Sequence, residues 1–371
     1  MLGKKLIVWL AVTLTALAVT ACAATASPTV APSANPTLDM TPAKIRYGDV
    51  TGVALPTLLV AEGQGFFAKE NITIEKYGFN GTGPVTDALA AGNLDIGVTA
   101  PAPSILATVK GAKTIMVSGY ENSFIEKTGK AWEPLYVVVR AGEGIQKLTD
   151  LKGKKAAVSD IGSYSNFALR AVMLENKIDP DKDMVIVPIP YSQQPGALMQ
   201  KQVDAILTST DGYLQAQKLG KVDVIATHTS LMNLDMDASS TVGVNTDFLQ
   251  NKPDAVVRFL RAFLQARQWM ADDVAKNDGK NMMDLVAKAM KYTPEQTQSF
   301  FQMRAGYYGK ELDRVNLLDV PTRSINRYYE ILKVNGYIKS DTSSDYQKVV
   351  DIRPLKQAYL SLGLTWDESK H

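Results

Sequence analysis

The sequence predicts an α/β protein built from two lobes that are joined by two crossover segments. From about residue 44, short apolar stretches of strand type alternate with helical stretches, and the alternation occurs in two successive sets. Strands that alternate with helices are typical of parallel βαβ sheets covered on both faces. A length of 371 residues also suffices for two domains. The crossovers are expected near Leu135–Arg140 and at 227–241.

The first set of elements occupies residues 44–140. Gly65 suits the end of a helix, and Phe66 and Phe67 directly after it suit a core. The expected strands are 44–47, 72–77, 94–98, 114–119 and 135–140. The expected helices are 56–65, 84–91 and 104–110.

The second set is followed by a helical tail. Its expected strands are 154–159, 184–188, 205–208, 222–227 and 241–245, and its expected helices are 166–176, 195–201 and 213–218. The tail is expected to form helices at 254–275, 282–290, 294–304, 318–335 and 354–362. In the first helix of the tail, Val256, Phe259, Leu260 and Phe263 recur at helical spacing, which predicts a stripe that faces the core.

The N-terminus resembles a lipoprotein signal. Lys4 and Lys5 precede a charge-free stretch that ends in Val-Thr-Ala-Cys, and Cys22 is the only cysteine of the chain. A basic start, a short apolar run and small residues before the cut are typical of a signal peptide. Val-Thr-Ala-Cys resembles the bacterial lipobox, which implies that Cys22 becomes the lipid-carrying first residue, as in palmitate-bearing lipoproteins. An ordinary signal peptide with an incidental thiol is the alternative.

Composition argues against several classes of function. The chain has 40 Lys and Arg against 38 Asp and Glu, so it lacks the basic excess of nucleic-acid-binding proteins. No cysteine follows Cys22, which excludes cysteine-ligated metals and disulfides in the body. The only histidines are His228 and His371, and no P-loop, Gly-x-Ser-x-Gly or His-Glu-x-x-His segment occurs. We therefore expect no enzyme, no metal site and no cofactor.

Four segments carry a resemblance to a known family. They are Ala61-Glu-Gly-Gln-Gly-Phe-Phe-Ala-Lys69, Ala88-Leu-Ala-Ala-Gly-Asn-Leu-Asp-Ile-Gly97, Asp150-Leu-Lys-Gly-Lys-Lys155 and Lys201-Gln-Val-Asp-Ala205. Their order resembles that in substrate-binding components of ABC importers of the nitrate/sulfonate/taurine type, although Lys201 stands where that family usually has glycine. The resemblance implies a two-lobed periplasmic-binding-protein fold, type II-like, a small-molecule ligand, and a permease and a cytoplasmic ATPase as partners.

The expected organisation follows from these observations. We expect a signal peptide at 1–21 and, at 22–43, the lipidated Cys22 with a flexible tether rich in Ala, Ser, Thr and Pro. Lobe I is expected at 44–139 and 241–371, and lobe II at 140–240. The lipid would hold the protein on the extracytoplasmic face of the cell membrane.

The ligand is expected beyond the carboxyl ends of the strands, where helix N-termini present free backbone N–H groups. Gly81-Thr82-Gly83 invites close backbone approach. The candidate ligand-binding residues are Asp49, Thr51, Gly81, Thr82, Gly83, Thr99, Tyr120, Trp132, Ser163, Tyr164, Ser165, Asn166, Tyr191, Gln193, Thr210, Asp211 and Tyr213. The Ser, Thr and Asn residues among them could equally be helix caps, and the tyrosines packing residues.

The strand-to-helix loops among these candidates contain Tyr164, Tyr191 and Tyr213 but no lysine or arginine, and Tyr120 and Trp132 lie near the first expected crossover. Aromatic side chains around a cleft favour a flat, neutral ligand, and relatives of this family take up riboflavin and thiamine-pathway pyrimidines. The sequence is thus interpreted as that of a vitamin-type binder, with taurine, an alkanesulfonate or nitrate as the alternative ligand. A sensing role beside a membrane receptor is the alternative to transport. A pyrimidine-synthesising enzyme is disfavoured because that family's cysteine-rich motif is missing.

Overall fold

The computed structural model describes residues 37–125, 131–233, 236–308 and 318–367. Thr37–His371 forms one compact unit that contains two separate β-sheets. The expected signal peptide, Cys22 and the expected tether as far as residue 36 lie outside the described residues. In the part of the chain that the structure describes, no helix has both the length and the hydropathy needed to cross a bilayer.

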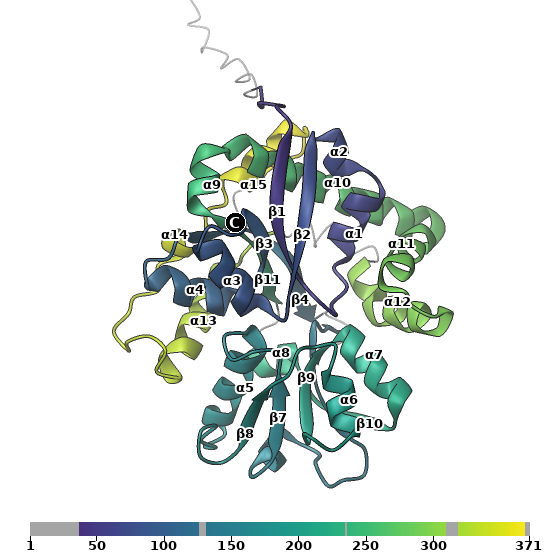
Figure 1. Ribbon diagram of the computed structural model, residues 1–371, viewed down its shortest axis with the longest axis vertical. Helices are drawn as coiled ribbons and strands as arrows, with labels where there is room; N and C mark the ends of the chain where they lie inside the picture. Colours follow the sequence, from purple (N-terminus) through teal and green to yellow (C-terminus); the bar gives the residue numbers. More distant parts are fainter. Residues whose placement is uncertain (1–36, 126–130, 234–235, 309–317, 368–371) are drawn as a thin grey trace, which may run out of the picture. The chain divides into compact units, whose positions relative to one another are not determined.

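Lobe I is built on a six-stranded sheet in the order β2-β1-β3-β11-β4-β5 (Figure 1). Its strands are β1 (Ala43–Val50), β2 (Ile72–Phe79), β3 (Ile96–Thr99), β4 (Thr114–Ile125), β5 (Ala131–Trp132) and β11 (Met236–Asn245). The strands β1, β2 and β3 are parallel, whereas β11 runs antiparallel to both β3 and β4. The sheet is therefore mixed rather than purely parallel, because a strand from the C-terminal half of the chain is inserted at its centre.

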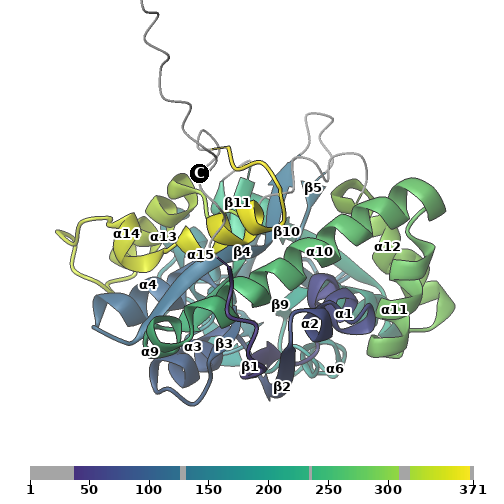
Figure 2. The ribbon, with the colours of Figure 1, turned by 90° about the horizontal axis from the view of Figure 1, so that it is seen from above.

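Helices from both halves of the chain surround this sheet (Figures 1 and 2). They are α1 (Pro56–Gly63), α2 (Phe66–Lys69), α3 (Thr82–Ala90), α4 (Pro101–Val109), α9 (Thr246–Asn251), α10 (Pro253–Asn277), α11 (Lys280–Met290), α12 (Pro294–Tyr308), α13 (Thr322–Val334), α14 (Tyr346–Val349) and α15 (Arg353–Ser361). Phe259 and Phe263 of α10 are buried 4.6 Å apart, and Phe259 also stacks on Tyr47 of β1. The predicted apolar stripe does face the core of lobe I.

A buried ion pair fastens α10 to the segment between α2 and β2. The carboxylate of Glu70 is 3% exposed and accepts hydrogen bonds from Nε of Arg261, at 3.0 and 2.9 Å, and from Nε2 of Gln265. The neighbouring Arg258 donates to the carbonyl oxygens of Glu70 and Thr41. The start of the folded body is thereby tied to a helix more than 200 residues away in sequence.

Lobe II is built on a five-stranded sheet in the order β10-β6-β9-β7-β8. Its elements are β6 (Leu135–Arg140), the 3-10 helix η1 (Leu148–Leu151), β7 (Lys155–Val158), α5 (Tyr164–Glu175), β8 (Val185–Pro188), α6 (Gln194–Met199), β9 (Ala205–Ser209), α7 (Thr210–Leu219), β10 (Val222–Thr227) and α8 (His228–Met232). The strands β8, β7 and β9 are parallel, and β6 runs antiparallel to β9 and β10.

The sheets correct the expected lobe boundaries and crossovers. Leu135–Arg140 is not a crossover and does not belong to lobe I, because it pairs with β9 and β10 in the sheet of lobe II. Residues 236–240, expected in lobe II, are the first half of β11 in lobe I. The chain passes between the sheets after β5 and again between β10 and β11, where α8 lies. The sheet to which a strand belongs depends on pairing partners that are distant in sequence, and local hydrophobic periodicity does not indicate those partners.

Candidate functional site

A cavity between the two sheets is the strongest candidate for a binding site. It has an empty volume of about 640 Å³, part of which is open to solvent, within the size range of small-molecule sites. We call it the interlobe cavity. Its lining residues are Val50, Val53, Leu55, Thr82, Val98, Pro134, Leu135, Tyr164, Tyr191, Ser209, Ser239 and Ser240. Both lobes contribute, so a ligand here would contact both at once.

The interlobe cavity lies at the edge predicted for a binding site in open α/β sheets. Val50 and Ser209 are the last residues of β1 and β9, and Val98 is next to last in β3. Three helices begin at the cavity wall: α3 at Thr82, α5 at Tyr164, and α7 directly after Ser209. The first N–H groups of a helix have no partner within it and carry the positive end of its dipole, so oxygen-rich groups are stabilised there.

The chemistry of the wall is apolar and hydroxylic. Valine, leucine and proline form half of the lining, and serine, threonine and tyrosine form the other half. Among the described residues that line the interlobe cavity there is no Lys, Arg, Asp or Glu. A ligand with an apolar portion and several hydrogen-bond acceptors fits such a wall, because the hydroxyls and helix N-termini can donate to its oxygens.

Three contacts join the lobes around the cavity. The backbone N–H of Ala54 in lobe I donates to Oδ2 of Asp211 in α7, at 2.9 Å. Gly52 of lobe I lies against Ser192, since a Cβ added to this glycine would come within 3.1 Å of the Ser192 backbone nitrogen. Gly81 and Gly83 lie in the same way against Asp160 and Gly162 of lobe II. The two lobes are therefore in direct contact around the cavity.

Two carboxyl groups near the lobe junction have raised pKa values. Burial raises the pKa of Asp160 to about 6, although the Gly162 N–H and the Ser159 hydroxyl counteract that rise. Burial likewise raises the pKa of Asp49 to about 6, against the effects of Lys76 and the Val50 N–H. Both groups therefore change charge within one to two pH units of neutrality.

The structure brings three of the predicted residues into the cavity wall: Thr82, Tyr164 and Tyr191. Three more, Gly81, Gly83 and Asp211, form the contacts between the lobes. Thr82, Tyr164 and Asp211 lie in first turns of helices rather than in loops, because α3, α5 and α7 begin two or three residues earlier than expected.

Several predicted residues stand behind the wall as structural polar groups. Ser163 caps α5, and Ser165 accepts from the N–H of Ser159. Asn166 donates through Nδ2 to the carbonyl of Ile161. The hydroxyl of Thr210 donates to the carbonyl oxygen of Glu133. Thr99 shares a buried hydroxyl–hydroxyl hydrogen bond with Thr241 across β3 and β11. These groups hold the wall in place without belonging to it.

The remaining predicted residues lie elsewhere, and with them the expected ring of aromatic side chains disappears. Tyr120 is buried in the core of lobe I, edge-on to Phe263 at 5.1 Å, and Tyr213 stacks on Tyr136 of its own lobe. The side chain of Trp132 lies outside the described residues. The residues Asp49, Thr51 and Gln193 are also absent from the cavity lining. Among the predicted aromatic residues whose side chains are described, Tyr164 and Tyr191 are the two that line the cavity.

Sequence analysis missed most of the apolar wall. Val53 and Leu55 closely follow the candidate residues Asp49 and Thr51, and the short apolar run 53–55 is the signal that could have indicated them. Ser239 and Ser240 come from β11, in a segment that was expected to cross between the lobes. His228 has a structural place: it is buried, and its Nδ1 is hydrogen-bonded to the hydroxyl of Tyr164.

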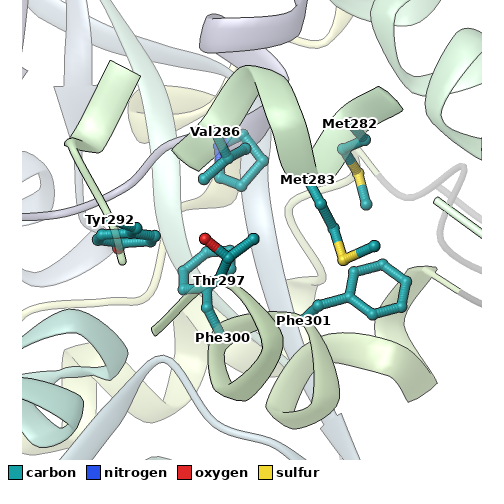
Figure 3. A pocket seen from close by; sticks show the side chains of 8 residues that line it. Met282, Met283, Val286, Tyr292, Thr297, Phe300 and Phe301 are labelled. Carbon is teal, nitrogen blue, oxygen red and sulfur yellow. The ribbon is translucent and has the colours of Figure 1, made fainter. Parts of the chain in front are cut away.

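A second hollow lies within lobe I, between α11 and α12 (Figure 3). Its lining residues are Pro56, Met282, Met283, Val286, Tyr292, Thr297, Phe300 and Phe301. It has an empty volume of about 250 Å³, and the side chains of the two helices point toward one another across it (Figure 3). Because lobe II contributes no lining residue, movement of the lobes would not enclose a ligand there. Among the described residues, no cluster of His, Cys, Asp or Glu could hold a metal ion.

Several known proteins are similar to this chain in sequence or in fold. A Bacillus subtilis (strain 168) protein, provisionally named an aliphatic sulfonates-binding protein, is 24% identical over 294 residues, which cover 77% of this chain and 85% of the relative. The periplasmic nitrate-binding protein NrtA from Synechocystis PCC 6803 has a similar structure, with a TM-score of 0.68 and 14% identity over 86% of this chain and 89% of that one.

Two further solved structures share the fold. The ligand-binding component of an ABC-type import system from Staphylococcus aureus has a TM-score of 0.65 and 16% identity, over 85% of this chain and 98% of that one. The desulfurization enzyme DszB has a TM-score of 0.56 and 15% identity, over 86% and 99%. The fold thus supports both binding and catalysis. The family model described as NMT1/THI5 like matches residues 55–276, and the chain therefore belongs to the NMT1/THI5-like family.

Proposed function

We propose that this protein is the extracytoplasmic solute-binding component of an ABC importer and that its ligand is a small aliphatic sulfonate. The observation that carries the proposal is the interlobe cavity, where an apolar wall stands beside hydroxyl groups and three helix N-termini. Binding would hold the two lobes together, and the closed form would dock on a permease that a cytoplasmic ATPase drives. The protein itself would perform no reaction.

The wall suits a sulfonate better than a vitamin. A sulfonate has three oxygens that accept hydrogen bonds, and helix N-termini with neighbouring hydroxyls supply donors and a positive field without a cation. Its alkyl chain would lie against Val50, Val53 and Leu55. A riboflavin-sized ring system would need the aromatic stacking that Tyr120 and Tyr213 cannot provide from the places they occupy. The alternative ligand of the sequence analysis is thus the better supported one.

The dependence of affinity on the ligand's alkyl chain length distinguishes a sulfonate site from a nitrate site. Burial of one methylene contributes about 0.8 kcal/mol, so each added methylene should strengthen binding about fourfold until the cavity is full. The test is isothermal titration calorimetry with methanesulfonate, ethanesulfonate and butanesulfonate. Nitrate and riboflavin are titrated in the same way as the alternative ligands. Binding of nitrate together with indifference to alkyl length would favour nitrate. Heat with riboflavin alone would restore the vitamin reading.

A pair of valine substitutions tests whether the ligand binds in the interlobe cavity. Val53→Asp puts a negative charge into the wall and should weaken sulfonate binding at least about tenfold, through repulsion in a poorly solvated space. Val109→Asp is the control, since Val109 is 43% exposed on α4 and lines no part of the cavity. Equal losses in the two variants would place the ligand elsewhere.

Attachment to the membrane through Cys22 remains part of the proposal. It is supported by the lipobox-like Val-Thr-Ala-Cys sequence and by the extracytoplasmic location of the NrtA relative. A Cys22→Ser variant should be released from membranes in cell fractionation, whereas the unchanged chain should remain with them and take up labelled palmitate. A chain that stays soluble with Cys22 intact would remove the anchor from the proposal.

A further inference from the structure

Asp160 of lobe II is inserted against the glycine turn that begins α3 in lobe I. A Cβ added to Gly81 would lie 2.1 Å from its Oδ2, and one added to Gly83 would lie 2.7 Å from its Oδ1. Both atoms of the carboxylate thus touch backbone that only glycine leaves open. Thr82, between the two glycines, lines the interlobe cavity.

The loop that carries Asp160 is firmly held. The hydroxyl of Ser163 donates to the carbonyl oxygen of Asp160 at 2.7 Å, and Nδ2 of Asn166 donates to the carbonyl of Ile161 at 2.6 Å. The backbone N–H of Ser163 also donates to the Asp160 carbonyl. These bonds fix the loop over the first turn of α5, so the carboxylate reaches lobe I from a rigid base rather than from a free loop end.

The surroundings of this carboxylate are weak in positive charge. The groups that act on its ionisation are the Ser159 hydroxyl, the Gly162 N–H and, from α3, Asp87, which is itself negative. From the segment before α6, Tyr191 faces the same region. Burial raises the pKa of its phenol, and Asp160 adds to that rise. No lysine or arginine is among the described groups that act on it. The charge is therefore offset by two hydrogen-bond donors rather than by a cation, and it lies near two residues of the cavity wall, Thr82 and Tyr191.

We propose that Asp160 is a specificity-determining residue that acts as a charge filter, weakening the binding of ligands whose only charge is negative. The inference rests on the proposed function, because the filter acts on ligands of the interlobe cavity. When Asp160 is ionised, an anion beside the N-terminus of α3 meets a carboxylate already placed there. An anion is then directed to the N-termini of α5 and α7. A ligand that also carries an ammonium group loses less binding affinity, because its positive charge is attracted to the carboxylate.

The test compares ethanesulfonate with 2-aminoethanesulfonate, which are of similar size and differ by one positive charge. Binding to the full chain is measured by titration calorimetry at pH 5 and pH 8 for the unchanged protein, Asp160→Asn and Asp87→Asn. The last variant is the matched control, because Asp87 is an exposed acid on α3 that acts on Asp160 only through space, as the last of the causes that shift the pKa of Asp160. Thermal midpoints without ligand are recorded across the same pH range.

At pH 8, Asp160→Asn should bind ethanesulfonate about tenfold more tightly than the unchanged protein, and 2-aminoethanesulfonate less than about threefold more tightly. In the unchanged protein, ethanesulfonate binding should strengthen from pH 8 to pH 5, since burial raises the pKa of Asp160 to about 6. Asp160→Asn should lose this pH dependence, and Asp87→Asn should keep it. An equal effect of Asp160→Asn on both ligands, or no effect, overturns the filter.

Failure of the ligand proposal gives a different pattern. If neither sulfonate binds any of the three proteins, the proposed ligand class is wrong. The thermal midpoints then test separately whether Asp160 is a desolvated charge at the glycine turn. In the unchanged protein the thermal midpoint should fall between pH 4 and pH 7. A smaller fall in Asp160→Asn, but not in Asp87→Asn, supports a desolvated charge at the glycine turn. Identical profiles in all three proteins overturn the filter as well.

Discussion

The backbone N–H of Ala54 and the carboxylate of Asp211 form a 2.9 Å hydrogen bond between the two lobes. Ala54 lies in the loop that leads from β1 into α1, and Asp211 lies in the first turn of α7. Neighbours of both residues, Val53, Leu55 and Ser209, line the interlobe cavity. The bond therefore joins the lobes at the place where a ligand would be enclosed.

Removal of this bond should favour separation of the lobes. A hydrogen bond to a charged group contributes about 1.5–3 kcal/mol, so Asp211→Ala should weaken ligand binding about tenfold or more. Small-angle X-ray scattering should show a larger radius of gyration for the ligand-free variant. Asp211→Asn is the control because it retains an oxygen acceptor for the Ala54 N–H. Unchanged scattering in Asp211→Ala would show that the bond does not hold the lobes.

Gly83→Ala should impair closure without unfolding either lobe. The new Cβ would lie 2.9 Å from the carbonyl carbon and oxygen of Gly162, which are backbone atoms of lobe II and cannot turn aside. Ligand affinity should fall, while the midpoint of urea unfolding should change little. Gly196→Ala in α6, where a Cβ meets open space, should leave both quantities nearly unchanged. A fall in stability equal to that in affinity would contradict this explanation.

The Glu70–Arg261 pair should dominate the electrostatic stability of lobe I. Removal of Glu70 takes the carboxylate from Arg261, whose side chain is 19% exposed and keeps only its hydrogen bonds to Ser361, so Glu70→Ala should lower the free energy of unfolding by about 3 kcal/mol. Lys44→Ala removes an exposed pair with Glu75, which water and salt screen, and should lower the free energy of unfolding far less. Urea unfolding followed by circular dichroism measures both, and equal losses would argue against burial as the cause.

The pH dependence of stability should carry a contribution from Asp49. Burial raises its pKa in the folded state to about 6, above the usual value of 3.8, so the folded state binds the proton more strongly than the unfolded state. The associated stability is complete below pH 4 and is lost as the pH rises through 6. Asp49→Asn should show a flatter thermal midpoint between pH 4 and pH 7.

Asp150 provides a contrast of opposite sign. Backbone N–H groups of Gln146 and Lys147 lower its pKa, so its contribution is present above the ordinary pKa and is lost as the pH falls through the lower, folded value. Asp150→Asn should therefore change the profile only on the acid side, below pH 4. A change in the same pH range as for Asp49→Asn would refute the assignment of both shifts.

The fold was largely predictable because hydrophobic periodicity is local. The expected bounds of Leu135–Arg140 and Val222–Thr227 agree with β6 and β10. What the sequence could not reveal is which sheet a strand joins, and β6 was consequently assigned to the wrong lobe. Its partner β9 lies about 70 residues further on, and the pairing depends on the packed lobe rather than on the strand's own residues.

The candidate site was predictable in position but not in character. The predicted edge of the sheets and the Gly81-Thr82-Gly83 turn lie beside the interlobe cavity, since both follow from the order of strands and helices, and ligand binding there stays a prediction. The aromatic interpretation failed for Tyr120 and Tyr213, because a tyrosine after a strand can turn toward the core as easily as toward the cleft. Nothing in the spacing of these residues distinguishes the two orientations.

The position of β11 at the centre of the first sheet sets an order of assembly. All five strands of lobe II fall within 135–227, so that sheet can pair fully while the rest of the chain is still being delivered. In lobe I, β3 and β4 share no neighbour until residues 236–245 arrive, and two strand edges stay exposed until then. A chain interrupted after β10 would thus contain one fully paired sheet, still without the α13 side chains that pack on α5, and one sheet with open strand edges that is prone to aggregation.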